Sequence, residues 1–265
     1  MEYRRILGGT RLPDKKPRVA VYKFTGCAGC QMELLRLEEE LLDLAAEIEI
    51  VYFMMAKTEV DLGPYDICFV EGSVSTPREL EELKILRSVS RVLVAFGDCA
   101  VAGCVPSIRN WMKQAEAEAI VYEDRKKILS FRVRGLDEFV PVDVVLPGCP
   151  PDRKLILRTV ISALQGIAPR IDSFPVCVEC KMKENECLLK LGKACMGPVT
   201  RAGCGAICPS FGRECEGCYG PMSDANAKQL ATVFMEDLGL SKEDVLRKFR
   251  KYAGMTDEFR RDAGL

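Results

Sequence analysis

Cysteine is distributed very unevenly along this chain of 265 residues. Of its 14 cysteines, six lie in residues 1–172 and eight lie in residues 173–222. A chain of this length can bury a hydrophobic core without cross-links, so the cysteines are not needed as disulfides that stabilise the fold. Histidine is absent, which removes the commonest nitrogen ligand of protein metal sites. Any metal centre in this protein must therefore be held mainly by thiolates.

The charge and hydropathy of the chain exclude several classes of protein. The 38 Lys and Arg residues nearly balance the 39 Asp and Glu residues, so no basic surface for a nucleic acid is expected. No run of about 18 apolar residues is present, which predicts no membrane span. Arg4 and Arg5 are not followed by an apolar segment, so we predict no export signal and a cytoplasmic location. In that reducing compartment, clustered cysteines more often bind metal than form disulfides.

Residues 1–172 alternate strand-like and helix-like segments. Thr76, Pro77 and Glu79 form the start signal of a helix, with Thr76 as its N-cap. Apolar residues at helical spacing predict a helix over 30–46, and a further helix is expected over 151–164. Strands are expected at 18–24, 48–54, 66–70, 91–96 and 142–146. This alternation predicts an α/β domain with a flavodoxin-like, doubly wound parallel sheet.

Residues 173–265 are expected to form a second, cysteine-rich domain. The stretch 173–222 is rich in glycine and proline and shows little periodicity, so it has few apolar anchors. Metal ligation would supply folding free energy to such a segment. Two helices are expected after it, over 224–238 and 241–252, the second with Ser241 as its N-cap.

Four cysteines of the first domain follow predicted strands. Cys27 and Cys30 follow the first strand, and Cys99 and Cys149 follow two later ones. Loops at the carboxyl edge of a parallel sheet gather in one place, so these thiols are expected to meet. We predict that they hold one [4Fe–4S] cluster. The alternative is a thioredoxin-like redox pair at Cys27 and Cys30, which would leave the other two without a role.

Two further cysteines lie outside this pattern. Cys68 is inside a predicted apolar strand and is expected to be a buried apolar residue. Cys104 is near the Cys99 loop, where it is available as a substitute ligand.

The second domain offers two more sets of four thiolates, the number that one [4Fe–4S] cluster needs. Each set contains one CxxC pair and two further cysteines. In chain order the sets are Cys177, Cys180, Cys187 and Cys195, then Cys204, Cys208, Cys215 and Cys218. A zinc site with four cysteine ligands is the competing interpretation, because such sites also use CxxC pairs. The inner cysteines here lack that spacing, which fits a zinc ribbon poorly.

Four motifs carry a resemblance to a known family. They read TGCAGC at 25–30, VEGS at 70–73, GDCAVAGCVPS at 97–107 and PGCPP at 147–151. Together with the cysteine-rich segment they resemble the small, electron-transfer subunit of nickel–iron hydrogenases, over about residues 19–221. The eight-cysteine segment is most similar to the cytoplasmic, cofactor-coupled group that includes sulfhydrogenase. The rival is the cluster-bearing subunit of respiratory complex I, whose first two cysteines are adjacent rather than spaced as in CAGC.

The resemblance implies a role for each cysteine set. Cys27, Cys30, Cys99 and Cys149 would hold a proximal cluster, nearest the nickel–iron centre of a separate large subunit. The set that begins at Cys204 would hold a medial cluster, and the set that begins at Cys177 would hold a distal one. No residue of this chain is expected to be catalytic. Electrons would pass on to flavin- or iron–sulfur-containing subunits, whose final acceptor the sequence does not name.

Two positions depart from the membrane-bound relatives. Cys177 stands where those relatives have a distal histidine, and Cys208 stands where they have a medial proline. Both changes predict clusters held by thiolate alone and a lower distal potential. Glu71 matches an acidic position beside the proximal cluster in the family, and its structural alternative is a strand-end residue bonded to a nearby loop. Arg153 is expected near the contact with the large subunit.

The sequence therefore leaves three candidate functions. The first is an electron-transfer subunit of a hydrogenase with three [4Fe–4S] clusters. The second is a zinc-stabilised binding module fused to an α/β domain. The third is a cluster-bearing subunit of a non-hydrogenase reductase or a relative of complex I.

Overall fold

A computed structural model describes residues 15–260 apart from 39, 41–43, 45, 125–128 and 168. Five parallel strands form one sheet in the order β2-β1-β3-β4-β5, with β1 at Arg18–Lys23, β2 at Glu49–Phe53, β3 at Tyr65–Glu71, β4 at Ser90–Phe96 and β5 at Val144–Leu146. This is the flavodoxin-like strand order, in which the chain reverses direction across the sheet beside β1. The predicted fold class and all five predicted strands are confirmed.

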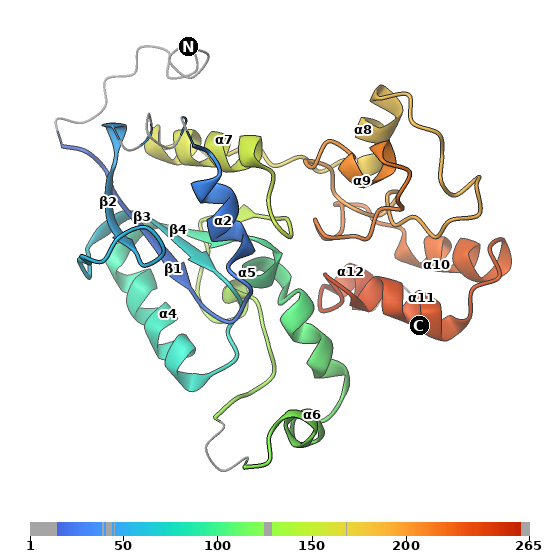
Figure 1. Cartoon of the computed structure of the whole chain (residues 1–265), viewed down its shortest axis with the longest axis horizontal. Helices are drawn as coiled ribbons and strands as arrows, with labels where there is room; N and C mark the ends of the chain where they lie inside the picture. Colours follow the sequence, from blue (N-terminus) through green and yellow to red (C-terminus); the bar gives the residue numbers. More distant parts are fainter. Residues whose placement is uncertain are drawn as a thin grey trace.

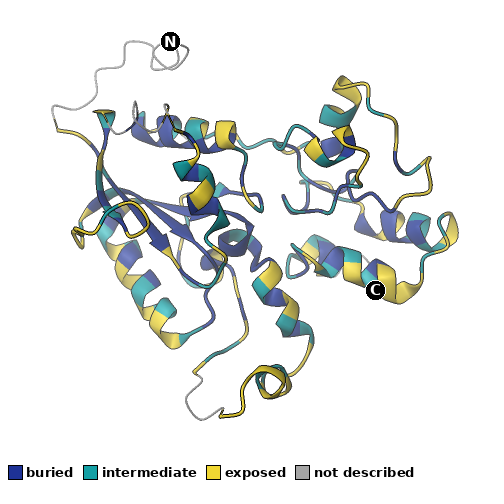
Figure 2. Ribbon diagram, viewed as in Figure 1, coloured by how far each residue is buried: buried dark blue, intermediate teal, exposed yellow. Residues whose placement is uncertain are grey.

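The two faces of the sheet bury alternate residues of each strand. Val19 and Val21 of β1 pack with helices α2 (Gly29–Leu35) and α7 (Arg153–Leu164) on one face. Ala20 and Tyr22 pack with helix α4 (Pro77–Val89) on the other face. Figure 1 shows α4 and α7 on opposite sides of the sheet, and Figure 2 shows the strands between them buried.

Some helix ends predicted from the sequence agree with the structure, and others do not. Thr76 caps α4 as expected: its side chain accepts from the Glu79 N–H, and the Glu79 carboxylate accepts in return. The helix expected from Pro151 begins instead at Arg153, because the Asp152 carboxylate accepts from the Lys154 N–H and is the N-cap. The helix expected over 30–46 is also wrong in extent. Its first part ends at Leu35, before a left-handed Glu38, while Leu41 and Leu42 lie outside the described residues.

The cysteine-rich region follows α7 and carries short helices joined by long irregular segments (Figure 1). Its helices are α8 (Val176–Met182), α9 (Ile207–Ser210), α10 (Ala227–Glu236), α11 (Lys242–Arg250) and α12 (Asp257–Arg260). Apolar faces of α10 and α11 bury Phe234 and Phe249 against Met196 and Val199 of the irregular part. The two expected C-terminal helices are confirmed, with Asn226 and Ser241 as N-caps, and α12 was not expected.

Four more helices lie in the described residues between β4 and β5. They are α5 (Asp98–Ala102), which leaves the end of β4, the 3₁₀ helix η1 (Val105–Trp111), α6 (Gln114–Val121) and the 3₁₀ helix η3 (Leu136–Glu138). Among the described residues, no helix combines the length and the apolar character needed to cross a lipid bilayer.

Candidate iron–sulfur sites

The first cysteine set gathers at the carboxyl edge of the sheet. Cys27 follows β1, Cys30 lies in the first turn of α2, Cys99 begins α5 after β4, and Cys149 follows β5. Burial raises the pKa of the Cys30 thiol, and Glu71 and the thiols of the other three add to the rise. The four predicted ligands therefore lie within electrostatic reach of one another, although their loops are far apart in the sequence.

Glycine allows the loops to approach this closely. Gly97 has φ 84°, which L-residues rarely adopt, and a Cβ placed on it would lie 2.2 Å from Cys30 Sγ. A Cβ on Gly29 would lie 3.2 Å from Cys27 Sγ. A residue larger than glycine at either position would therefore press against a cysteine sulfur. Glycine at these positions lets the loops wrap closely around a bulky group.

Cys104 is part of the same site, although the sequence offered it only as a substitute ligand. Its side chain is fully buried, and its interaction with the thiols of Cys149 and Cys99 raises its pKa. It adopts φ 43° without being glycine, a conformation that persists only when the surroundings impose it. Its neighbour Asp98 is 1% exposed, and burial raises the pKa of that carboxyl to about 8.

Glu71 lies beside Cys30 in this first site. It ends β3, is buried, and its Oε1 accepts a hydrogen bond from the Cys30 N–H at 3.3 Å. Burial raises the pKa of the Glu71 carboxyl. The contact fits its structural interpretation, a strand-end carboxylate that holds the start of α2 in place.

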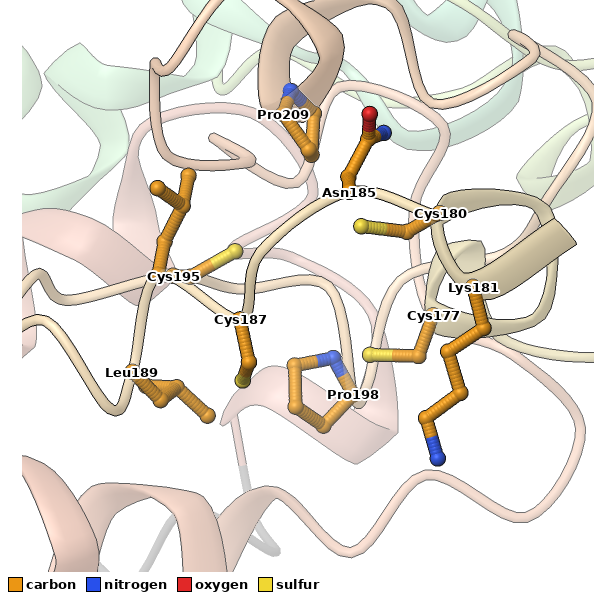
Figure 3. A pocket seen from close by; sticks show the side chains of 10 residues that line it. Cys177, Cys180, Lys181, Asn185, Cys187, Leu189, Cys195, Pro198 and Pro209 are labelled. Atoms are coloured by element: carbon orange, nitrogen blue, oxygen red, sulfur yellow. The ribbon is translucent and has the colours of Figure 1, made fainter. Parts of the chain in front are cut away.

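The set that begins at Cys177 surrounds one cavity of about 60 Å³, shown in Figure 3. Cys177 and Cys180 project from α8, whereas Cys187 and Cys195 come from the irregular segment that follows. In Figure 3 the sulfurs of Cys177, Cys180 and Cys195 turn toward the space between them. Burial raises the pKa of Cys177 to about 11, with Cys195 and Cys180 contributing.

Gly197 lies between two of these sulfurs. A Cβ there would be 3.3 Å from Cys177 Sγ and 3.4 Å from Cys195 Sγ. A larger residue at this position would therefore press against both sulfurs.

The set that begins at Cys204 borders a larger cavity of about 400 Å³. This cavity is lined by Cys204, Cys208, Cys215 and Cys218, and also by Cys149 of the first set. Burial raises the pKa of Cys215 to about 12 and raises that of Cys218. Arg153 lines the same cavity, and its guanidinium donates to the Arg36 carbonyl at 3.0 Å. Arg153 thus ties the start of α7 to the end of α2.

Two contacts join the second and third cysteine sets. The Cys215 N–H donates to Cys195 Sγ at 3.2 Å. Glu179, between Cys177 and Cys180, accepts from the Gly203 N–H at 3.0 Å and from the Ala206 N–H at 3.2 Å. Both N–H groups flank Cys204, so one carboxylate connects the helix of one set to the loop of the other.

All 14 cysteines lie in the described residues, and all are free thiols. Cys68 is buried in β3, where it was expected as an apolar residue, and burial raises its pKa to about 12. Within the described part of the chain, no three cysteine or carboxylate side chains converge closely enough to bind a single ion.

Comparisons with known proteins give the family. The family described as the 20 kDa subunit of NADH ubiquinone oxidoreductase matches residues 27–163. The delta subunit of sulfhydrogenase 2 from Pyrococcus furiosus is 39% identical, over 89% of this chain and 99% of that protein. A subunit of the F420-non-reducing hydrogenase vhu from Methanocaldococcus jannaschii is 34% identical, over 77% of this chain and 81% of that protein.

A solved structure agrees with these relatives. It is that of an NAD⁺-reducing [NiFe]-hydrogenase in the H2-reduced state, which is similar with a TM-score of 0.54 and 30% identity over 59% of this chain and 95% of that one. The matches to hydrogenase subunits favour the first of the three candidate functions. This chain belongs to the NADH ubiquinone oxidoreductase 20 kDa subunit family and, within it, to the sulfhydrogenase-like small subunits of nickel–iron hydrogenases, the oxidoreductases that act on H2.

Proposed function

We propose that this chain relays electrons through three [4Fe–4S] clusters, between the nickel–iron site of a large subunit and a further redox subunit in the cytoplasm. Cys27, Cys30, Cys99 and Cys149 would hold the proximal cluster. The set from Cys204 would hold the medial cluster and the set from Cys177 the distal one. We also propose that residues 1–172 and 173–265 act as two domains, each with its own cluster sites.

The serial contact of the three cysteine sets carries this proposal. Cys149 of the first set lines the cavity of the set from Cys204. Cys215 of that set donates its N–H to Cys195 of the remaining set. These two contacts support the proposed order proximal, medial, distal, which is the order that a relay between two partner subunits needs.

When bound, each cluster would carry electrons at a potential set by its ligands and its burial. The residues of this chain hold and orient that centre. The N–H of Cys30 is turned to Glu71 rather than to sulfur, whereas the N–H of Cys215 is turned to Cys195 Sγ. Because Cys177 and Cys208 replace a histidine and a proline of the membrane-bound relatives, all ligands would be thiolates, which keeps the potentials low.

The surroundings of the proposed proximal cluster support a contact with a large subunit. Cys27 is exposed, whereas the other three proximal cysteines are buried or half-buried. Exposed apolar side chains lie at the same edge of the sheet, among them Met32 and Val105. We propose that this edge faces the nickel–iron subunit.

Metal analysis of the anaerobically purified complex tests the proposal. We expect about twelve iron atoms and about twelve acid-labile sulfides per chain, as three [4Fe–4S] clusters require. A nickel-containing partner should co-purify with the chain. Zinc without sulfide would refute the proposal in favour of a binding module, and iron–sulfur clusters without nickel would favour a non-hydrogenase reductase.

A further inference from the structure

Large apolar side chains are exposed together on one face of the cysteine-rich region. Met182 and Phe211 are each 79% exposed, more than any other large apolar residue in the described part of the chain. Each has an exposed apolar partner four residues earlier in the chain: Val178 lies with Met182 on α8, and Ile207 begins α9, whose C-cap is Phe211. Single exposed apolar residues are ordinary, but two stacked pairs form a patch.

Hydrogen bonds hold together the two segments that carry these pairs. They connect the segment that follows α8 with the segment around α9: Lys183 Nζ to the Gly205 carbonyl, Asn185 Nδ2 to Ser210 Oγ, and Lys193 Nζ to the Gly212 carbonyl. Figure 1 shows α8 and α9 together at the end of the molecule away from the sheet, and Figure 2 shows exposed residues on both. We call the surface formed by Val178, Met182, Leu191, Ile207 and Phe211 the Met182–Phe211 face.

The surroundings of this face are positively charged. Exposed cations between 181 and 213 are Lys181, Lys183, Lys190, Lys193 and Arg213, whereas the exposed acidic residues in the same stretch are Glu184 and Glu186. The whole chain has a formal net charge of only −1, so this excess of cations is local. A partner surface that carries carboxylates around an apolar centre would complement it.

The face also borders the distal cysteine set. Lys181 and Pro209 line the cavity of that set; Lys181 precedes Met182 on α8, and Pro209 lies in α9. Cys187, one of the four cysteines, is itself exposed. A protein that covers the Met182–Phe211 face would therefore come close to the distal cluster.

We propose that the Met182–Phe211 face is the docking surface of an acidic redox subunit, which exchanges electrons with the distal cluster. Apolar contact at Met182 and Phe211 holds the partner, and the surrounding lysines select an acidic rim. The inference rests on the proposed function, because it needs a cluster at the distal cysteines.

The test uses the affinity-purified hydrogenase complex. One variant carries Met182→Glu and Phe211→Glu, and a second carries Lys190→Glu, an exposed rim residue. Ile85→Glu on α4 is the matched control, because Ile85 is also exposed and apolar but lies on the sheet domain. The readouts are the subunits that co-purify, the iron content, and H2-dependent reduction of methyl viologen, a small dye that needs no docking protein.

We expect the double variant to lose the co-purifying flavin- or iron–sulfur-containing subunit by about tenfold or more, as buried interface anchors do. Viologen reduction and iron content should persist, and Lys190→Glu should make the complex dissociate at lower salt. An unchanged subunit composition in the double variant would overturn the inference. So would loss of the nickel-containing subunit alone, which would assign this face to the large subunit. Absence of iron and sulfide from the unaltered complex would instead refute the proposed function.

Discussion

Replacing Glu179 should loosen the medial site, although Glu179 is not a ligand of either set. Its carboxylate lies on α8 between Cys177 and Cys180, and it accepts the N–H groups on both sides of Cys204. Glu179→Ala removes both acceptor oxygens, so the N–H groups of Gly203 and Ala206 can then bond only to water. Glu179→Gln keeps one acceptor oxygen but loses the charge.

The magnitude follows from the two hydrogen bonds. A bond to a charged group contributes about 1.5–3 kcal/mol when buried. Glu179 is half-buried, so solvent screening reduces the sum for the two bonds to about 2–4 kcal/mol. For a chain of this size that corresponds to a fall in the thermal midpoint on the order of 8 °C, and roughly half of that for the Gln variant.

Thermal unfolding followed by iron analysis measures the effect. We expect Glu179→Ala to lower the midpoint and to retain about eight irons per chain instead of about twelve, because one cubane of four is lost. Glu186→Ala is the control, since Glu186 is exposed in the same region. An alanine variant with an unchanged midpoint and full iron content would refute the reasoning that this carboxylate holds the Cys204 loop.

The remaining predictions concern the contacts around the sites. Cys104→Ser should leave about twelve irons in place, but it should shift the electron paramagnetic resonance signal of the proposed proximal cluster, because the buried Cys104 interacts with Cys149 and Cys99 without being a proposed ligand. Loss of four irons would instead make it a ligand. Tyr219→Phe should lower the thermal midpoint by several degrees, at about 1–3 kcal/mol, because the Asp152 N–H donates to the Tyr219 hydroxyl at 2.6 Å; an unchanged midpoint would contradict this. Glu216→Gln should cost about 1 kcal/mol at pH 7. Burial alone would raise the pKa of Glu216, but hydrogen bonds from Lys251, the C-cap of α11, and from Lys248 of α11 hold that pKa below its ordinary value. The ionised carboxylate therefore stabilises the fold at pH values above the ordinary pKa, and this stabilisation is lost as the pH falls. The free energy of unfolding should therefore change less between pH 7 and pH 4 in the variant than in the native protein.

Strands and capped helices were predictable because their signals are local. β1 to β5 are short apolar runs, and the capping box at Thr76 needs only neighbouring residues. The early end of α2 was not predictable in the same way. Its apolar spacing continues past Leu35, yet the chain breaks at a left-handed Glu38. Tertiary packing overrides a helical pattern in such places.

The candidate sites were predictable only in part. The parallel-sheet rule indicated that Cys99 and Cys149 would approach Cys30, and they do lie near it. The position of Cys104 between two of these thiols depends on the turn after α5, where Gly103 has φ 79°. No spacing rule in the sequence reports such a turn. Glu179 was missed for a similar reason, because its partners are more than twenty residues away along the chain.

The hydrogen bond between the Cys215 N–H and Cys195 Sγ has a consequence for assembly of the protein. A sulfur that lost its iron would become a neutral thiol and a weaker acceptor, so emptying one site would relax the backbone of the neighbouring one. Each of these two clusters should then be retained more tightly when the other is present, and loss of one should speed the loss of the other during maturation.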